Sequence, residues 1–152
     1  VAFPQDGLLR HKLQWSWMQQ AILSGKADVI GGIPHYELCR DLGIESVRLI
    51  VDFAMKENKR VDLHCDEVDD PQSRFVEDLA ARILLSGDQS ASSSDQTLDE
   101  KFTGKLVTAS HTTAMGSYEN GYFNKLRSRL VESQMNFVAN PLINIVLQGR
   151  SD

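Results

Sequence analysis

The sequence predicts an α/β fold in which parallel strands alternate with helices. Short apolar runs alternate along the chain with segments of helical period, which is the pattern of consecutive βα units. The predicted strand ends also recur at a regular interval, since 31 residues separate Ile33 from His64 and 29 separate His111 from Asn140. Polar side chains gather at these strand ends, as they do on the working face of a (β/α) barrel. We therefore predict part of a (β/α)8 barrel.

Each predicted strand is a short run rich in apolar residues. In chain order, the runs cover residues 1–3, 29–33, 61–64, 106–111 and 136–139. The segments between them carry apolar residues at intervals of three and four, a stripe that packs a helix on a sheet. The four stripes are Leu13, Trp17, Ala21 and Ile22; Val47, Ile50, Val51, Ala54 and Met55; Phe75, Val76, Leu79, Ala80 and Ile83; and Tyr122, Phe123, Leu126 and Leu130.

The third of these helices has a predicted start, and a polar tract is expected to follow it. Asp70 followed by Pro71 suits an N-cap and a first helical position. The interval from His64 to His111 is 47 residues, longer than one βα unit, and the excess falls on a serine-rich polar tract. Such a tract buries too little apolar area to order itself. We expect one partial barrel domain over residues 1–152, with a flexible polar insert at about 87–103.

Composition limits the classes of function. The chain has 152 residues, of which 41% are hydrophobic and 24% charged, with a net charge of −5. The acidic balance disfavours nucleic acid and favours a small-molecule partner. No apolar run approaches the length of a membrane span, and the two cysteines, Cys39 and Cys65, form no C-x-x-C pair. We expect a cytoplasmic protein without a membrane partner.

The polar residues that could bind a ligand or take part in a reaction lie at or just after predicted strand ends. They are Gln5, His35, His64, Glu67, His111 and Asn140. Side chains alternate along a strand, so Asp62, His64 and Asp66 are expected to share one direction and Cys65 to point the other way, into packing. Neutral imidazoles bind Zn(II) or Fe(II), and a nearby carboxylate can carry protons. Two histidines alone are weak evidence, because a strand-end histidine is often a structural residue.

Four longer runs carry a more specific signal. They are residues 3–7 (FPQDG), 62–77 (DLHCDEVDDPQSRFVE), 107–115 (VTASHTTAM) and 137–142 (FVANPL). Together they closely resemble the bacterial cytosine deaminases of the amidohydrolase superfamily. The resemblance covers nearly the whole chain except the serine-rich tract. It implies an amidohydrolase-type TIM barrel, of which this chain would hold roughly strands 3 to 7.

The same resemblance implies an activity and roles for residues. The activity is metal-dependent hydrolysis of cytosine to uracil and ammonia, a step of pyrimidine salvage, with one divalent metal, Fe(II) or Zn(II), in a homo-oligomer. By position, His64 matches a metal ligand, and His111 matches the histidine that contacts the attacking hydroxide at the metal. Glu67 matches the carboxylate that protonates the ring nitrogen. Gln5 matches the residue that reads the pyrimidine through its amide, and Phe3 lines the same pocket.

Other aromatic and histidine residues have simpler interpretations. His35, after Pro34, is expected to support the site rather than to react, and His11 to lie at the surface. Trp15 and Trp17 fit helix packing better than base stacking.

The sequence also departs from the family pattern. The family has an H-x-H pair on its first strand and a metal-binding aspartate on its last, and this chain has no H-x-H; Asp152 is not placed to be that aspartate. We therefore expect an internal fragment that is inactive by itself. Two alternatives stay open: a related amidohydrolase acting on isocytosine or an aminotriazine, and a non-enzymatic half-barrel that binds another subunit.

Overall fold

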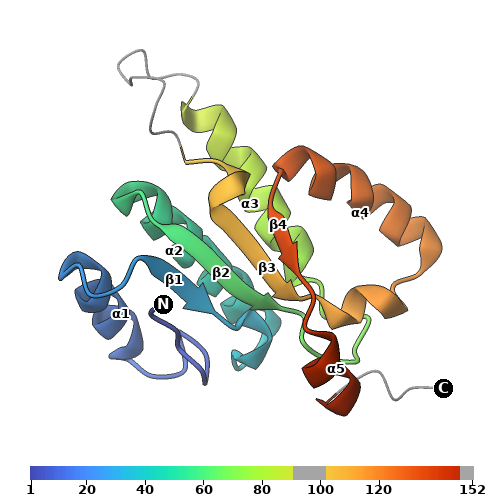
Figure 1. Cartoon of the computed structure of the whole chain (residues 1–152), viewed down its shortest axis with the longest axis horizontal. Coiled ribbons are helices and arrows are strands. Elements are labelled where there is room, and N and C mark those ends of the chain that lie inside the picture. The colour runs from blue at the N-terminus through green and yellow to red at the C-terminus, as the bar shows by residue number, and fades with distance from the viewer. Residues whose placement is uncertain (91–101, 148–152) are drawn as a thin grey trace.

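The structure, a computed structural model, describes residues 1–90 and 102–147. Its centre is a four-stranded parallel sheet in the order β1-β2-β3-β4 (Figure 1). The strands are β1 (Val29–Gly32), β2 (Arg60–Cys65), β3 (Val107–His111) and β4 (Asn136–Val138). Sequential order and parallel pairing confirm the predicted α/β class.

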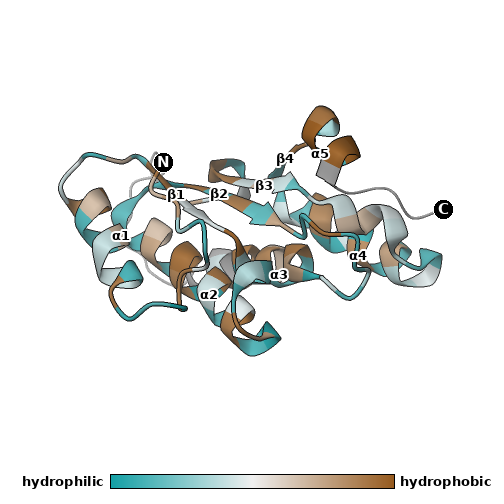
Figure 2. Ribbon diagram, turned by 90° about the horizontal axis from the view of Figure 1, so that it is seen from below, coloured by the Kyte–Doolittle hydropathy of each residue, from teal (hydrophilic) through white to brown (hydrophobic). Residues whose placement is uncertain are grey.

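Helices alternate with the strands along the chain. They are α1 (Gln14–Leu23), α2 (Arg40–Glu57), α3 (Phe75–Ser90), α4 (Asn120–Ser133) and α5 (Pro141–Leu147). Short 3-10 turns follow β1 (η1, Pro34–Tyr36) and flank β3 (η2, Gly104–Leu106; η3, Thr113–Ser117). Figure 2 shows α2 and α3 beneath the sheet and α5 on the opposite side. Within the described part of the chain, no helix is both long enough and apolar enough to cross a membrane.

The core lies between the sheet and the helices. Val61, Leu63 and Cys65 of β2 are at most 1% exposed and belong to one cluster with the apolar faces of α2 and α3. Burial raises the pKa of the Cys65 thiol well above its usual range. Cys65 is therefore a packing residue, as predicted. The alternate residues Asp62 and His64 remain partly exposed, so the face away from the helices is polar.

The register of β2 and β3 places their ends at the same level. His64 pairs with Ser110 and Cys65 with His111. One layer below, the Ser110 hydroxyl donates a 2.7 Å hydrogen bond to Asp62 Oδ1. Parallel pairing thus brings the residues that follow both strands to one edge of the sheet.

The first predicted strand is reduced to a single bridge. Ala2 pairs with Ile30 through two backbone hydrogen bonds, from Ala2 N to Val29 O and from Gly31 N to Ala2 O. Pro4 follows two residues later and has no N–H to extend the ladder. The segment still lies beside β1, with the Phe3 ring against Gly31.

The predicted start of α3 is wrong. The helix begins at Phe75, and the Asp70 carboxylate instead accepts a 2.8 Å hydrogen bond from Gln72 N within a turn. The helix is capped by Asp66, whose carboxylate accepts from Phe75 N and Val76 N, both at 2.9 Å. The N-terminus of α3 is thus capped by a buried carboxylate from the end of β2 and not by the Asp70 that directly precedes Pro71.

The expected insert begins later than the sequence suggests. Helix α3 continues to Ser90, so residues 87–90 are helical. Residues 91–101 of the insert lie outside the described residues. Helix α5 was not among the predicted elements, and its start has the proline at the first helical position that is typical of helix N-termini.

We expect the Leu63→Ala substitution to lower the free energy of unfolding by about 2 to 5 kcal/mol, because it opens a cavity between the sheet and the helices. Leu63 is 0% exposed, whereas Leu23, at the end of α1, is 64% exposed. Leu23→Ala is the matched control and should stay within about 0.5 kcal/mol of the parent. Urea unfolding followed by circular dichroism measures both, and equal midpoints for the two variants would contradict this arrangement of the core.

Candidate functional site

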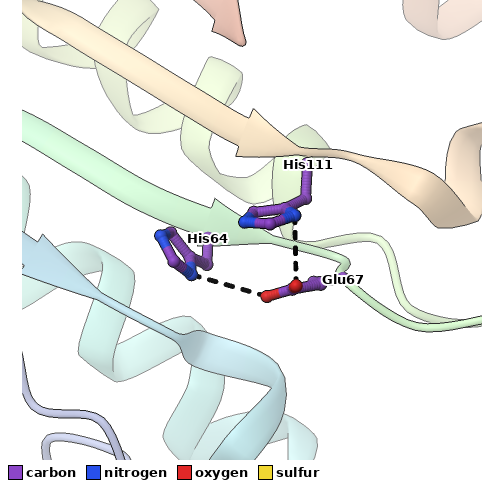
Figure 3. A group of neighbouring side chains, drawn as sticks. All are labelled: His64, Glu67 and His111. Carbon is purple, nitrogen blue, oxygen red and sulfur yellow. Dashed lines mark ion pairs between the residues drawn. The ribbon is translucent and has the colours of Figure 1, made fainter. Parts of the chain in front are cut away.

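Three polar residues from two adjacent strand ends form one cluster. His64 is the next-to-last residue of β2, Glu67 follows in the loop, and His111 ends β3. Figure 3 shows the Glu67 carboxylate reaching both imidazoles. Glu67 Oε2 lies 3.4 Å from His64 Nδ1, and Oε1 lies 3.1 Å from His111 Nδ1. The two rings are 4.5 Å apart between centroids. The structure thus brings together the three residues singled out at these strand ends.

A change of backbone conformation places His111 in the cluster. By strand alternation, His111 belongs on the helix-covered face with Val107 and Ala109. Its φ is instead 71°, and that of Thr112 is 51°, both in the left-handed region. The side chain consequently meets His64 and Glu67 on the polar face. Left-handed φ values at non-glycine residues are sparse in proteins and concentrate at functional sites.

The cluster is largely shielded from water. The side chain of His111 is 7% exposed, that of Glu67 14% and that of His64 30%. Burial lowers the pKa of His64, and the neighbouring His111 lowers it further, while Glu67 opposes the shift. Burial and histidine pairing therefore favour the neutral imidazole, which is the form that binds metal.

Asn144 on α5 is a site residue that sequence reasoning missed. Its Oδ1 lies 2.8 Å from His111 Nδ1. Since the neighbours of Nδ1 are oxygen acceptors from Asn144 and Glu67, we place the proton on Nδ1, which leaves Nε2 with a free lone pair. The sequence does hint that Asn144 has a specific role, because asparagine is unfavourable inside a helix and position 144 interrupts an apolar run.

The N-terminal segment contributes Phe3 to the cluster. The Phe3 ring lies 4.6 Å from the His64 ring, between centroids. Gln5, two residues later, is exposed in a turn. The structure therefore brings Phe3 against a cluster residue and leaves Gln5 at the solvent side of the same segment.

His35 lies in η1, near His64 and His111. Both of its ring nitrogens are buried and make no hydrogen bond of normal geometry. Burial lowers the pKa of His35 to about 4, and the nearby His64 and His111 add to the shift. His35 is therefore a neutral residue at ordinary pH.

Asp66 does not share the direction of Asp62 and His64, and that prediction is wrong. Its φ of 56° turns the chain at the end of β2, and the residue is 0% exposed. Its carboxylate points to the N-terminus of α3 rather than to the polar face. Burial raises the pKa of Asp66, whereas hydrogen bonds from Ser73, Val76 and Phe75 lower it.

The donor set fits a divalent transition metal. His64, Glu67 and His111 each offer one ligand atom, and these atoms all lie within 4.8 Å of one another. Two imidazoles and a carboxylate are donors that Zn(II) and Fe(II) both accept, and catalytic zinc sites combine three protein ligands with an open position. The arrangement places two imidazoles and a carboxylate where they could bind one cation.

A parallel sheet with a polar cluster just beyond its strand ends is the arrangement found at the working face of a (β/α) barrel. Two solved structures of 5-methylcytosine deaminase from Klebsiella pneumoniae, with phosphonocytosine and with 5-fluorocytosine, are similar to this chain. Each is 45% identical over 99% of the chain, with a TM-score of 0.84. This chain spans about a third of the length of those deaminases, 33% and 32%. The resemblance to cytosine deaminase is thereby confirmed.

A more distant structure shares the fold. The N-isopropylammelide isopropylaminohydrolase of Burkholderia multivorans is 22% identical over 90% of the chain, with a TM-score of 0.64, and the chain covers 31% of it. No protein-family model and no curated protein matches this chain.

We expect the neutral state of His35 to make stability depend on pH. Its pKa is about 4 in the fold against an ordinary value of 6.5, so the unfolded chain binds more protons between these values. The contribution is complete above pH 6.5 and is lost as the pH falls to about 4. His35→Phe should flatten the unfolding free energy in this window, while His11→Gln, at an exposed histidine, should keep the parent slope. Urea unfolding at several pH values measures this, and a parent-like slope in His35→Phe would contradict it.

Proposed function

We propose that this chain supplies part of the active site of an enzyme that hydrolytically deaminates cytosine or a similar pyrimidine. One observation carries the proposal: a carboxylate joins two imidazoles at neighbouring strand ends, in a chain 45% identical to a deaminase solved with cytosine analogues. The chain by itself is proposed to be inactive, because it has no H-x-H pair and spans about a third of the length of that deaminase.

His64 and His111 are proposed to hold one divalent metal, Fe(II) or Zn(II). When bound, the metal supplies Lewis acidity that makes hydroxide available at neutral pH. The lone pair left on His111 Nε2 by the contact of Nδ1 with Asn144 suits this role. In the alternative placement His111 binds the attacking hydroxide rather than the cation, and its position beside Glu67 serves either use.

Glu67 is proposed to move the protons. The reaction adds water to the amino-bearing carbon and releases ammonia, so one proton of the water must reach the ring nitrogen, where uracil keeps it, and the other must reach the departing amino group. Glu67 can accept one proton and donate it to the ring nitrogen, which makes the carbon more electrophilic. Its two oxygens face two different imidazoles, so the carboxylate is held while it exchanges protons.

The substrate is proposed to lie beside the N-terminal segment. The Phe3 ring next to His64 offers an apolar wall for a flat base. The exposed amide of Gln5 offers one acceptor and two donors, which match the adjacent carbonyl and N–H of cytosine. A small-molecule substrate, a homo-oligomer and a cytoplasmic place in pyrimidine salvage complete the proposal.

We expect activity when the chain completes a deaminase barrel. In a chimera, residues 1–152 replace the matching third of the Klebsiella deaminase, and ammonia release from cytosine and 5-methylcytosine is measured. Glu67→Gln should lower kcat by about 100-fold to 10,000-fold, because it removes the proton carrier. Glu132→Gln, at an exposed glutamate of α4, should leave kcat unchanged. A folded but inactive chimera, or a Glu67→Gln chimera with full activity, would refute the assignment.

Metal binding can be tested on the 152-residue chain itself. We expect His64→Ala and His111→Ala each to weaken Zn(II) binding by about tenfold or more, since each removes a donor from the cluster. His11→Ala removes a histidine that lies exposed outside the cluster and should keep the parent affinity. Isothermal titration calorimetry compares the affinities, and three equal affinities would show that zinc binds elsewhere.

A further inference from the structure

We propose that Asp66 is a positioning residue that holds Glu67 and His111 in register with one another. The inference rests on the proposed function, in which Glu67 carries protons beside His111. Asp66 precedes Glu67 directly and does not itself face the cluster. Its role is to join the loop that carries Glu67 to the loop that follows His111.

The Asp66 carboxylate accepts hydrogen bonds on both oxygens. Oδ1 accepts from the Ser73 hydroxyl at 2.7 Å and from Phe75 N at 2.9 Å. Oδ2 accepts from Val76 N at 2.9 Å. The Tyr118 hydroxyl oxygen lies 3.5 Å from Oδ2 and donates its proton to Ser73 O at 2.5 Å. One buried side chain therefore ties the end of β2 to the start of α3 and packs beside Tyr118, the residue that follows η3.

The backbone on either side of this carboxylate makes a second link. Asp66 O accepts from Ala114 N at 3.1 Å, and Cys65 O accepts from Thr112 N at 2.9 Å. Both donors belong to the segment that leaves His111. The segments that carry the proton carrier and its imidazole partner are thus joined through the main chain of Cys65 and Asp66, while the Asp66 side chain fixes the same turn to α3.

An aspartate suits this position for two reasons. Its φ of 56° lies in the left-handed region, which aspartate and asparagine adopt more readily than most residues. The N-terminus of α3 favours negative charge, and the three donors Ser73 Oγ, Phe75 N and Val76 N require both carboxylate oxygens. An asparagine keeps the backbone conformation, but its NH2 group turns a donor toward donors that need an acceptor.

A small shift at Asp66 is transmitted to Glu67 by the single peptide unit between them. The contact of Glu67 Oε1 with His111 Nδ1 is 3.1 Å, within the normal range of a hydrogen bond, whereas that of Oε2 with His64 Nδ1 is 3.4 Å, already beyond it. A misplacement of about 1 Å can lower the rate of an enzyme by about 100-fold. The position of the Asp66 backbone therefore decides whether Glu67 reaches both rings.

The competing explanation is that Asp66 is an ordinary helix cap that only stabilises the fold. The chain contains a matched control for it. Glu119 caps α4, where its Oε2 accepts from Tyr122 N at 2.9 Å, and it is exposed. Both residues are carboxylate caps of a helix N-terminus, but only Asp66 adjoins the cluster.

The experiment compares Asp66→Asn with Glu119→Gln by two readouts. In the 152-residue chain, long-range 1H–15N spectra of the histidine rings report their contact with Glu67. We expect Asp66→Asn to shift the Nδ1 signals of His64 and His111 while Glu119→Gln leaves them unchanged. In the deaminase chimera, Asp66→Asn should lower kcat by about 10-fold to 100-fold with KM within about twofold. Glu119→Gln should change neither constant.

The outcomes separate this inference from the proposed function. Parent-like ring signals in a folded Asp66→Asn chain overturn the positioning role, as does an unchanged kcat. If the chimera with the natural Asp66 is folded but inactive, the proposed function fails while the ring signals still decide whether Asp66 places Glu67. If Asp66→Asn unfolds, Ser73→Ala is measured instead, because it removes the Ser73 hydroxyl that donates to Asp66 and keeps the carboxylate. Unchanged ring signals in a folded Ser73→Ala chain overturn the inference.

Discussion

The parallel pairing of β2 with β3 is the constraint on which the site depends. Because Cys65 pairs with His111, the two strands end at the same level and the residues beyond them are forced together. The helix-covered face holds this register with fully buried apolar side chains. A slip of one residue would move His64 into the core and Leu63 to the polar face. The chemistry of the cluster is therefore secured by packing on the other side of the sheet.

At the ends of β2 and β3, two side chains point to the opposite side from the one that strand alternation predicts. Strand geometry would leave His111 facing the core and Asp66 facing the polar side. Left-handed backbone at both positions reverses each direction, so the histidine reaches Glu67 and the aspartate reaches the helix. The buried network around Asp66 offsets the cost of these conformations with hydrogen bonds, which is how local strain persists at functional sites.

Much of the fold follows from local pattern. The strands β1 to β4 and the helices α1 to α4 are predictable from apolar runs and stripes, although the stripe of α4 is less regular than the others. The positions of His64, Glu67 and His111 at strand ends mark them as candidates, and the family resemblance assigns their roles. The start of α3 is not predictable in this way, since its cap comes from Asp66 nine residues before Phe75 and not from the local Asp70. The contact of Asn144 with His111 joins residues 33 apart and depends on how α5 packs over the sheet. Contacts between residues far apart in the sequence cannot be predicted from the spacing of apolar residues.

The most direct test of a metal and proton-transfer site at these strand ends is a zinc anomalous difference map from crystals of the chain soaked in a zinc salt. We expect a peak at about 2.0 to 2.1 Å from an imidazole nitrogen of His64, with His111 and Glu67 beside it. Zinc found only on surface carboxylates, with the His64 and Glu67 side chains still in contact, would contradict the account.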